Sequence, residues 1–228
     1  MSKKKTQQSS EQLEAVESAL SRSEQFIEEN QKVITIVVLS ILGAVALFMG
    51  IKRYYINPLE NEAQSQMFVA EQYFEADSFD LALYGDGNYF GFVDIIDEYG
   101  ITKSGNLAKY YTGISYLRLG EYEDAISYLK KFNAKDKIVG AIKYGSMGDA
   151  YMELGDISKA IKLYNQASEY NKNEFTSPIY LMKAGYAYES LGDYKSALKA
   201  YQIIKEEYPE SSEGRNIEKY ITRAELNL

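Results

Sequence analysis

One phrase occurs three times in this chain, and its recurrence constrains the fold more than any other feature. The three versions, "LRLGEYEDAISYL", "MELGDISKAIKLY" and "ESLGDYKSALKAY", align on Gly120, Gly155 and Gly192, which lie 35 and 37 residues apart. A period of this length is typical of two helices joined by a short turn and stacked on similar neighbours. The sequence therefore predicts an all-α solenoid built of helix pairs.

Small and bulky residues recur at fixed places around these glycines. In the first helix of each unit, a glycine is followed three residues later by a tyrosine. In the second helix, an alanine is followed one turn later by a large side chain. The three sets are Gly113, Tyr116, Ala125 and Leu129; Gly148, Tyr151, Ala160 and Tyr164; and Gly185, Tyr188, Ala197 and Tyr201. Because a small residue facing a large one lets two helices interlock, we expect these positions to form the contact inside each pair.

This pattern resembles the tetratricopeptide repeat (TPR) family. The resemblance covers residues 103–210, and Pro209 stands where the family has its closing proline. In the first two units that place is taken by Lys137 and Lys172. The resemblance implies a TPR α-solenoid that binds other proteins and has no catalytic residues.

An uncharged apolar run, "VITIVVLSILGAVALFMGI", extends from Val33 to Ile51. As a helix it would reach about 28 Å, close to the hydrocarbon thickness of a bilayer. One alternative is a buried core helix. A cleaved signal peptide is disfavoured, because a long polar segment precedes the run and its small-x-small element, Ala44 to Ala46, lies inside it. We expect residues 33–52 to form a transmembrane signal anchor, surrounded by lipid around residues 33–51.

Basic residues on the two sides of this run predict its orientation. Those before it are Lys3, Lys4, Lys5, Arg22 and Lys32, and those directly after it are Lys52 and Arg53. Because cytoplasmic flanks of transmembrane helices carry the excess of Lys and Arg, the N-terminus is expected in the cytoplasm. The repeat domain is then expected on the other side of the membrane.

Three further segments complete the predicted organisation. Residues 1–32 are acidic and carry apolar residues at helical spacing, which suits either a partly ordered cytosolic tail or a docking helix for a membrane partner. Residues 53–102 should hold membrane-proximal helices with a turn at Gly87, and are a candidate degenerate repeat. Three TPR units fill residues 103–210. Residues 211–228 carry one apolar stripe, as expected of a C-terminal capping helix.

The composition argues against catalysis. The chain has no His and no Cys, so imidazole bases, thiol nucleophiles and the common zinc ligands are missing. The glycine-rich stretch "GDGNYFG" lacks both the preceding strand and the Lys-Ser/Thr pair of a phosphate-binding loop. The acids Asp94, Asp97 and Glu98 fall on the polar side of a helix. We therefore expect no enzyme activity, no cofactor and no metal.

The remaining candidate function is binding, and the charge indicates which partners are suitable. From Asn57 onward there are 18 basic and 27 acidic residues, a balance that repels a nucleic-acid backbone. We expect a protein partner, held by the row of side chains that the first helices present on one face. The row consists of Leu107, Tyr110, Ile114, Leu117, Arg118, Ile142, Met152, Ile179, Met182 and Tyr186. Its apolar and aromatic character suits a helix or an extended apolar segment. The alternative is that neighbouring units bury part of the row.

The order of segments carries a second resemblance. The acidic lead "EQLEAVESALSRSEQFIEENQK", one span followed by "KRYY", the TPR domain and the closing "AELNL" are similar to the YfgM-type ancillary subunits of the bacterial Sec translocon. This resemblance implies a single-pass protein of the bacterial inner membrane with periplasmic repeats. It would stand beside the SecYEG channel with a PpiD-type chaperone and assist secretory proteins. A scaffold of another envelope assembly or secretion machine is the alternative.

Overall fold

The computed structural model describes residues 26–228, and the chain divides into two compact units, Met1–Pro58 and Leu59–Leu228. All regular structure within the described residues is helical, and no strand occurs among them. The predicted all-α class is therefore confirmed for this part of the chain. Up to residue 25, the predicted N-terminal tail lies outside the described residues.

The first unit contains helix α2, Gln31–Ile51, followed by a short π-helix, Lys52–Ile56. Helix α2 is long and apolar enough to cross a membrane, and none of its residues is buried by other parts of the protein. The core helix of a soluble domain would be covered instead. Its polar Thr35 hydroxyl donates a hydrogen bond to the Gln31 carbonyl at 2.7 Å, so this group is satisfied within the helix.

The second unit begins with three helices that share one core. They are α3, Asn57–Glu75, α4, Phe79–Tyr84, and α5, Phe92–Tyr99. The ring of Phe92 lies 5.0 Å from that of Tyr111, stacked on it, and 6.3 Å from that of Phe74. The chain between α4 and α5 turns through Gly85 and Gly87, both with positive φ. Residues 53–102 thus include the expected turn at Gly87 and also a short helix, α4, that was not predicted.

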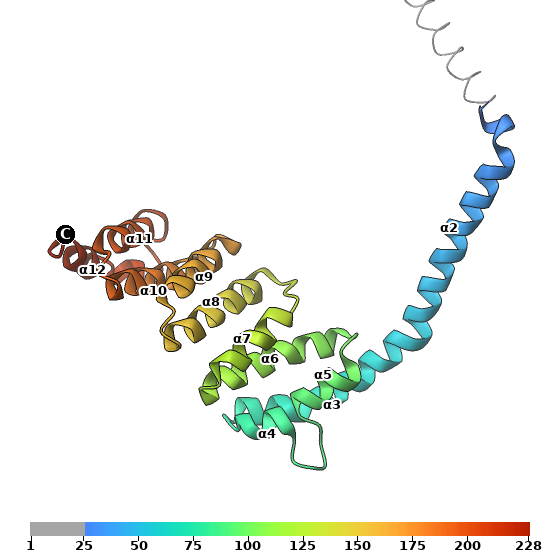
Figure 1. The fold of residues 1–228 in the computed structure, drawn as a ribbon, viewed down its shortest axis with the longest axis horizontal. Helices are drawn as coiled ribbons and strands as arrows, with labels where there is room; N and C mark the ends of the chain where they lie inside the picture. Colours follow the sequence, from blue (N-terminus) through green and yellow to red (C-terminus); the bar gives the residue numbers. More distant parts are fainter. Residues whose placement is uncertain (1–25) are drawn as a thin grey trace, which may run out of the picture. The chain divides into compact units, whose positions relative to one another are not determined.

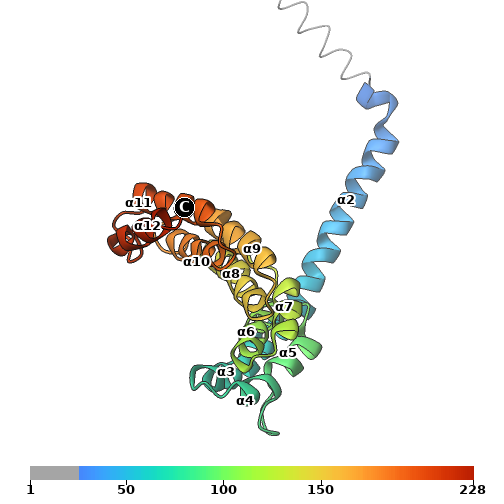
Figure 2. The same cartoon turned by 60° about the vertical axis from the view of Figure 1, so that its left-hand side comes forward.

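Three helix pairs follow in chain order (Figure 1). They are α6, Lys103–Leu119, with α7, Tyr122–Lys131; α8, Lys137–Glu153, with α9, Ile157–Tyr170; and α10, Ser177–Ser190, with α11, Tyr194–Glu207. A 3₁₀ turn, Gly214–Asn216, leads into the last helix, α12, Glu218–Glu225, beside α11 (Figure 2). The apolar stripe of this segment is buried against α10 and α11, with Ile217 and Ile221 in the same core cluster as Tyr201.

The repeated phrase spans the end of the first helix, the turn and much of the second helix in each pair. Its glycine has a left-handed backbone, with φ of +85° at Gly120, +77° at Gly155 and +73° at Gly192. Each glycine N–H donates to the carbonyl three residues earlier, and the next N–H donates to the carbonyl of the repeated tyrosine. This is a Schellman motif, which favours glycine because other residues rarely adopt positive φ. The three phrases therefore end the three first helices in the same way.

The second set of glycines marks the closest approach within each pair. A Cβ atom added at Gly148 would lie 2.6 Å from the Tyr164 ring, and one added at Gly185 would lie 2.2 Å from the Tyr201 ring. At Gly113 the same atom would lie 2.6 Å from Leu129. The predicted contact between small and large residues is therefore present in all three pairs.

The Glu60 carboxylate on α3 caps the N-terminus of α6. Glu60 Oε2 accepts hydrogen bonds from the N–H groups of Lys103, at 2.6 Å, and Ser104, at 3.3 Å. The Ser104 hydroxyl donates to Glu60 Oε1 at 2.9 Å. Burial alone would raise the pKa of Glu60, but these hydrogen bonds outweigh it and lower the pKa. We call this set of contacts the Glu60 clasp.

Candidate functional site

The first helices of the three pairs enclose a hollow of about 460 Å³, which we call the central groove. Helices α6, α8 and α10 contribute to its lining, together with the start of α7. The lining residues are Tyr110, Ile114, Leu117, Arg118, Tyr122, Ile142, Ser146, Asp149, Glu153 and Lys183. One side of the groove is mainly apolar and comes from α6, whereas the other side is mainly polar and comes from α8.

The apolar side of the groove is held rigidly by the core beneath it. Tyr110, Ile114 and Leu117 pack against a buried cluster that includes Leu129 and Met147, so each is only partly exposed. The Tyr110 ring also lies 5.4 Å from that of Phe132. Burial raises the pKa of the Tyr110 hydroxyl, so this side chain is neutral at physiological pH. The groove therefore offers a fixed, uncharged wall.

The polar side is organised around Asp149. Its carboxylate pairs with the Lys183 ammonium group, with Nζ 2.6 Å from Oδ1 and 2.7 Å from Oδ2, and accepts a hydrogen bond from the Tyr164 hydroxyl at 2.8 Å. The Lys183 ammonium group also lies 5.8 Å from the centre of the Tyr164 ring. Burial and the neighbouring carboxylate raise the pKa of Tyr164, which remains a hydrogen-bond donor. The network joins α8, α9 and α10, so it fixes the geometry of neighbouring repeats.

Two further charged residues, Arg118 and Glu153, line the groove. Within the part of the chain that the structure describes, neither Arg118 nor Glu153 forms a salt bridge. Both are exposed. An occupant of the groove would thus meet an apolar wall, one free cation and one free anion.

The structure brings five of the ten predicted site residues together. Tyr110, Ile114, Leu117, Arg118 and Ile142 all line the central groove. The other five do not. Leu107 lines a separate hollow near the start of α6.

Three predicted residues belong largely to the core. Met182 is only 8% exposed and lies in the cluster that also holds Tyr201 and Ile204. Met152 and Ile179 are partly buried against the cluster around Ala160 and Tyr164. This part of the predicted row is therefore covered by the chain's own helices, and Met182 offers almost no surface to a partner.

The last predicted residue, Tyr186, lies against the C-terminal helix. The residue is 39% exposed, and its ring lies 5.5 Å from that of Tyr220 on α12. The Arg223 guanidinium group, 6.0 Å from the centre of the Tyr186 ring, forms a salt bridge with Glu189 at 2.6 Å. Burial and the contact with Tyr220 raise the pKa of Tyr186 to about 12. Tyr186 thus attaches α12 to α10.

The sequence analysis missed the polar half of the groove. Ser146, Asp149 and Glu153 follow the predicted Ile142 at i+4, i+7 and i+11, which places them on the same face of α8. That spacing was visible in the sequence, but only apolar residues and one arginine were selected from the face. Lys183 had the same signal, because it follows the predicted Ile179 at i+4 on α10. Its pairing with Asp149 was not predicted.

Among residues 26–228 no group of three or more acidic side chains is placed to hold a metal ion. The central groove combines a partly exposed apolar side with a polar, charged side.

Family models and solved structures match the repeat part of the chain. Tetratricopeptide-repeat family models match residues 107–136 and 146–212, which confirms the predicted repeats. The TPR-like repeats of a Podosopora anserina kinesin light chain, in a variant form, match with a TM-score of 0.55 and 15% identity, over 73% of this chain and 86% of theirs. The MamA protein matches with a TM-score of 0.50 and 20% identity, over 72% of this chain and 91% of its own. These structures show the same fold. No curated protein sequence matches the chain significantly.

Proposed function

We propose that this chain, whose second unit carries tetratricopeptide repeats, is a membrane-anchored adaptor that holds another protein in the central groove. A tetratricopeptide fold is typically a scaffold for protein interactions and not a catalyst. The observation that carries the proposal is the groove itself, where helices from all three repeats surround one hollow.

The lining favours an amphipathic segment as the occupant. Tyr110, Ile114 and Leu117 would contact its apolar side chains. The free charges of Arg118 and Glu153 would pair with opposite charges on it and set its orientation. A purely apolar segment would leave both charges desolvated and unpaired, which is unfavourable.

Helix α2 supports the membrane anchor. Its uncovered apolar surface would be in contact with lipid, and the positions directly after it suit a membrane interface. Lys52 and Arg53 come first, followed by Tyr54 and Tyr55, which are 84% and 61% exposed. Basic and aromatic residues of this kind are enriched where a span meets the headgroups. On the charge argument, the N-terminus is proposed to be cytoplasmic and the repeats to lie on the other side of the membrane. The resemblance to YfgM-type subunits implies that this membrane is a bacterial inner membrane and that the repeats are periplasmic.

Protease accessibility tests this orientation. Protease added to intact spheroplasts should degrade the chain after Lys52, because the repeat unit is proposed to lie outside the cytoplasm. An immunoblot against an N-terminal tag should then show a short protected fragment. Cleavage of the repeat unit only after the membrane is ruptured would contradict the orientation.

By its resemblance to YfgM-type subunits, the adaptor is proposed to serve the SecYEG translocon, with a PpiD-type chaperone and secretory proteins as its other partners. The alternative is a scaffold of another envelope machine. Purification of the tagged full chain after mild detergent extraction separates the two. SecYEG and the chaperone should be recovered in amounts comparable with the bait, and recovery of a different envelope complex in their place would favour the alternative.

The role of the groove can be tested in the same purification. The double variant Ile114→Ala with Arg118→Ala removes part of the apolar wall and the free cation. Loss of a packed anchor typically costs about 2 kcal/mol of binding free energy or more, so we expect at least tenfold less partner to be recovered.

A matched control lies on another helix. Lys199 and Ile203 on α11 are also a basic and an aliphatic residue four positions apart, and both are exposed. The double variant Lys199→Ala with Ile203→Ala should recover the partner at the wild-type level. Equal losses for the two variants, or a melting temperature that falls in step with recovery for the groove variant alone, would show that the groove is not the binding surface.

A further inference from the structure

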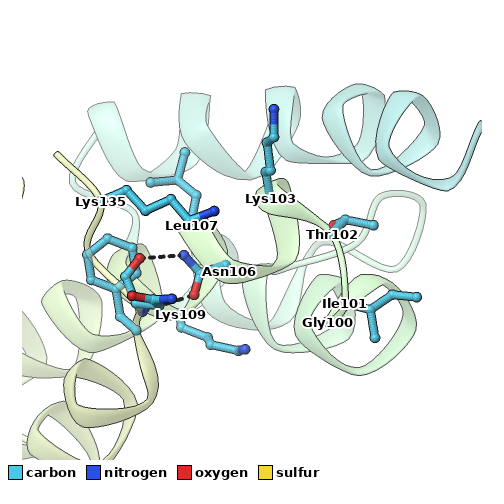
Figure 3. Close-up of a pocket in the computed structure, with 10 residues that line it drawn as sticks. Gly100, Ile101, Thr102, Lys103, Asn106, Leu107, Lys109 and Lys135 are labelled. Carbon is cyan, nitrogen blue, oxygen red and sulfur yellow. Dashed lines mark hydrogen bonds between the residues drawn. The ribbon is translucent and has the colours of Figure 1, made fainter. Parts of the chain in front are cut away.

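A second hollow of about 430 Å³ lies near the start of α6, and we call it the lysine pocket. Its lining residues are Gly100, Ile101, Thr102, Lys103, Asn106, Leu107, Lys109, Phe132, Asn133 and Lys135. Three lysines, two from α6 and one from the loop after α7, line it, and Figure 3 shows Lys103 and Lys109 pointing in opposite directions. None of the lining residues is shared with the central groove.

The three ammonium groups have no carboxylate partner. Across residues 26–228, no salt bridge involves Lys103, Lys109 or Lys135. Two acids lie nearby. Asp136 caps α8, with Oδ1 accepting hydrogen bonds from the N–H groups of Ile138 and Val139, and Glu60 accepts a hydrogen bond from the backbone N–H of Lys103. Within residues 26–228 neither carboxylate forms a salt bridge with a lysine of the pocket, so the three ammonium groups are available to an anionic ligand.

This local charge is opposite to that of the unit as a whole. Residues 100–145 hold eight basic and four acidic residues, whereas the chain from Asn57 onward holds 18 basic and 27 acidic ones. Unpaired like charges repel one another, so a cluster of them is unfavourable unless an anion is bound. The lysine pocket thus lies in a segment with net positive charge, within a unit whose net charge is negative.

The base of the pocket is rigid and partly apolar. The Asn106 side chain donates to the Asn133 carbonyl and accepts from the Asn133 N–H, both at 3.0 Å, which fixes the loop to α6 (Figure 3). Phe132 is buried beneath the loop, and Ile101 and Leu107 expose apolar surface beside the lysines. A ligand would therefore find apolar contacts between the charged groups.

We propose that the lysine pocket binds an acidic segment of a partner protein, in which glutamate or aspartate side chains alternate with apolar ones. The carboxylates pair with Lys103, Lys109 and Lys135, and the apolar side chains lie against Ile101 and Leu107. Such a segment matches both the charge and the apolar surface of the pocket.

A peptide matches this site better than an anionic lipid surface does. A membrane presents a flat layer of headgroups, whereas the lysines surround a hollow with an apolar base. The proposal stands independently of the central groove.

Peptide binding to the full chain in a neutral detergent tests the proposal. The probe is a fluorescent decapeptide of five glutamates, two leucines and three serines, and the comparison peptide has glutamine at each glutamate. We expect anisotropy to show binding of the glutamate peptide, with at least tenfold weaker binding of the glutamine peptide. Binding should weaken as salt is raised from 50 to 300 mM, since exposed charges are screened.

Two triple variants locate the binding. The variant Lys103→Gln, Lys109→Gln, Lys135→Gln should bind the glutamate peptide at least tenfold more weakly, equivalent to about 1.4 kcal/mol. The control Lys162→Gln, Lys195→Gln, Lys199→Gln changes the net charge equally at exposed lysines elsewhere and should bind like the wild type. Equal affinity of the two triple variants, or no binding of the peptide by the wild type, would overturn the proposal.

Lipid is distinguished by hydrogen exchange on the full chain in nanodiscs. In discs of phosphatidylcholine, residues 100–109 and 132–135 should gain protection only when the glutamate peptide is added. Protection of these residues in phosphatidylglycerol discs without peptide would assign the pocket to the lipid surface and overturn the proposal.

Discussion

Replacing Gly185 with valine is expected to destabilise the repeat unit by about 3 kcal/mol, because the new side chain would overlap the Tyr201 ring. Even a Cβ atom at this position would lie 2.2 Å from that ring, and Tyr201 is fully buried and cannot move aside. For a unit of this size, the melting temperature should fall by roughly 10 °C. Circular dichroism melts of the full chain in neutral detergent would measure the change.

Two further variants make this result specific. Ser190→Val adds the same side chain at an exposed position of the same helix and should leave the melting temperature nearly unchanged. The double variant Gly185→Val with Tyr201→Leu removes the ring and should recover at least about 1 kcal/mol relative to the sum of the single effects. If the effects of the two single variants on stability simply added, the side chains at 185 and 201 would not be in contact. The alignment of α10 against α11 described above would then be wrong.

The variant Phe92→Ala should destabilise the unit by about 3–5 kcal/mol, since it removes a fully buried ring and leaves a cavity. The lost contacts include the stacked ring of Tyr111 on α6 and the ring of Phe74 on α3. Urea unfolding followed at 222 nm would give the free energy of unfolding. A large effect would show that residues 59–99 fold together with the first repeat.

The control for this variant is Phe68→Ala. Phe68 lies on α3, but it is 61% exposed, so its truncation should change the free energy of unfolding by no more than about 0.5 kcal/mol. If Phe92→Ala were equally mild, the cluster beneath α3 and α5 would not contribute to the stability of the unit.

The repeat architecture could be predicted from sequence because its determinants are local. A Schellman turn at Gly120 or Gly155 requires one residue with positive φ, and the glycine in the sequence directly indicates that conformation. The match between Gly148 and Tyr164 joins two helices only a few residues apart in the chain. Local rules of this kind repeat with each unit, so one recognised unit predicts the next.

The site was harder to predict because burial depends on more distant neighbours. Helical spacing puts Ile114 and Met182 in one row, but the packing of α11 and α12 buries Met182 while Ile114 remains partly open. The sequence offers no direct sign that Lys183 would pair with Asp149 from the preceding repeat. Periodicity predicts which residues lie on the same face of a helix. It does not predict which other helices cover that face.

Helix α4 was missed for a related reason. It contains only Phe79–Tyr84, which is too short for periodicity to be recognised. The glycines after it were assigned to a single turn at Gly87, whereas both Gly85 and Gly87 have positive φ. At Gly85 the backbone is crowded, since an added Cβ atom would lie against Tyr89 and Gly91.

The Glu60 clasp has a mechanical consequence. Along the chain, α3 follows α2 and the short π-helix and precedes every repeat, and Glu60 joins it to Lys103 and Ser104 more than 40 residues later. Tension transmitted along the chain from α2 would therefore load this clasp before it reached α7 or any later helix. Hydrogen bonds that hold two distant points of the chain must yield before the segment between them can extend. Residues 61–102 would thus be shielded from the pull until the clasp opened.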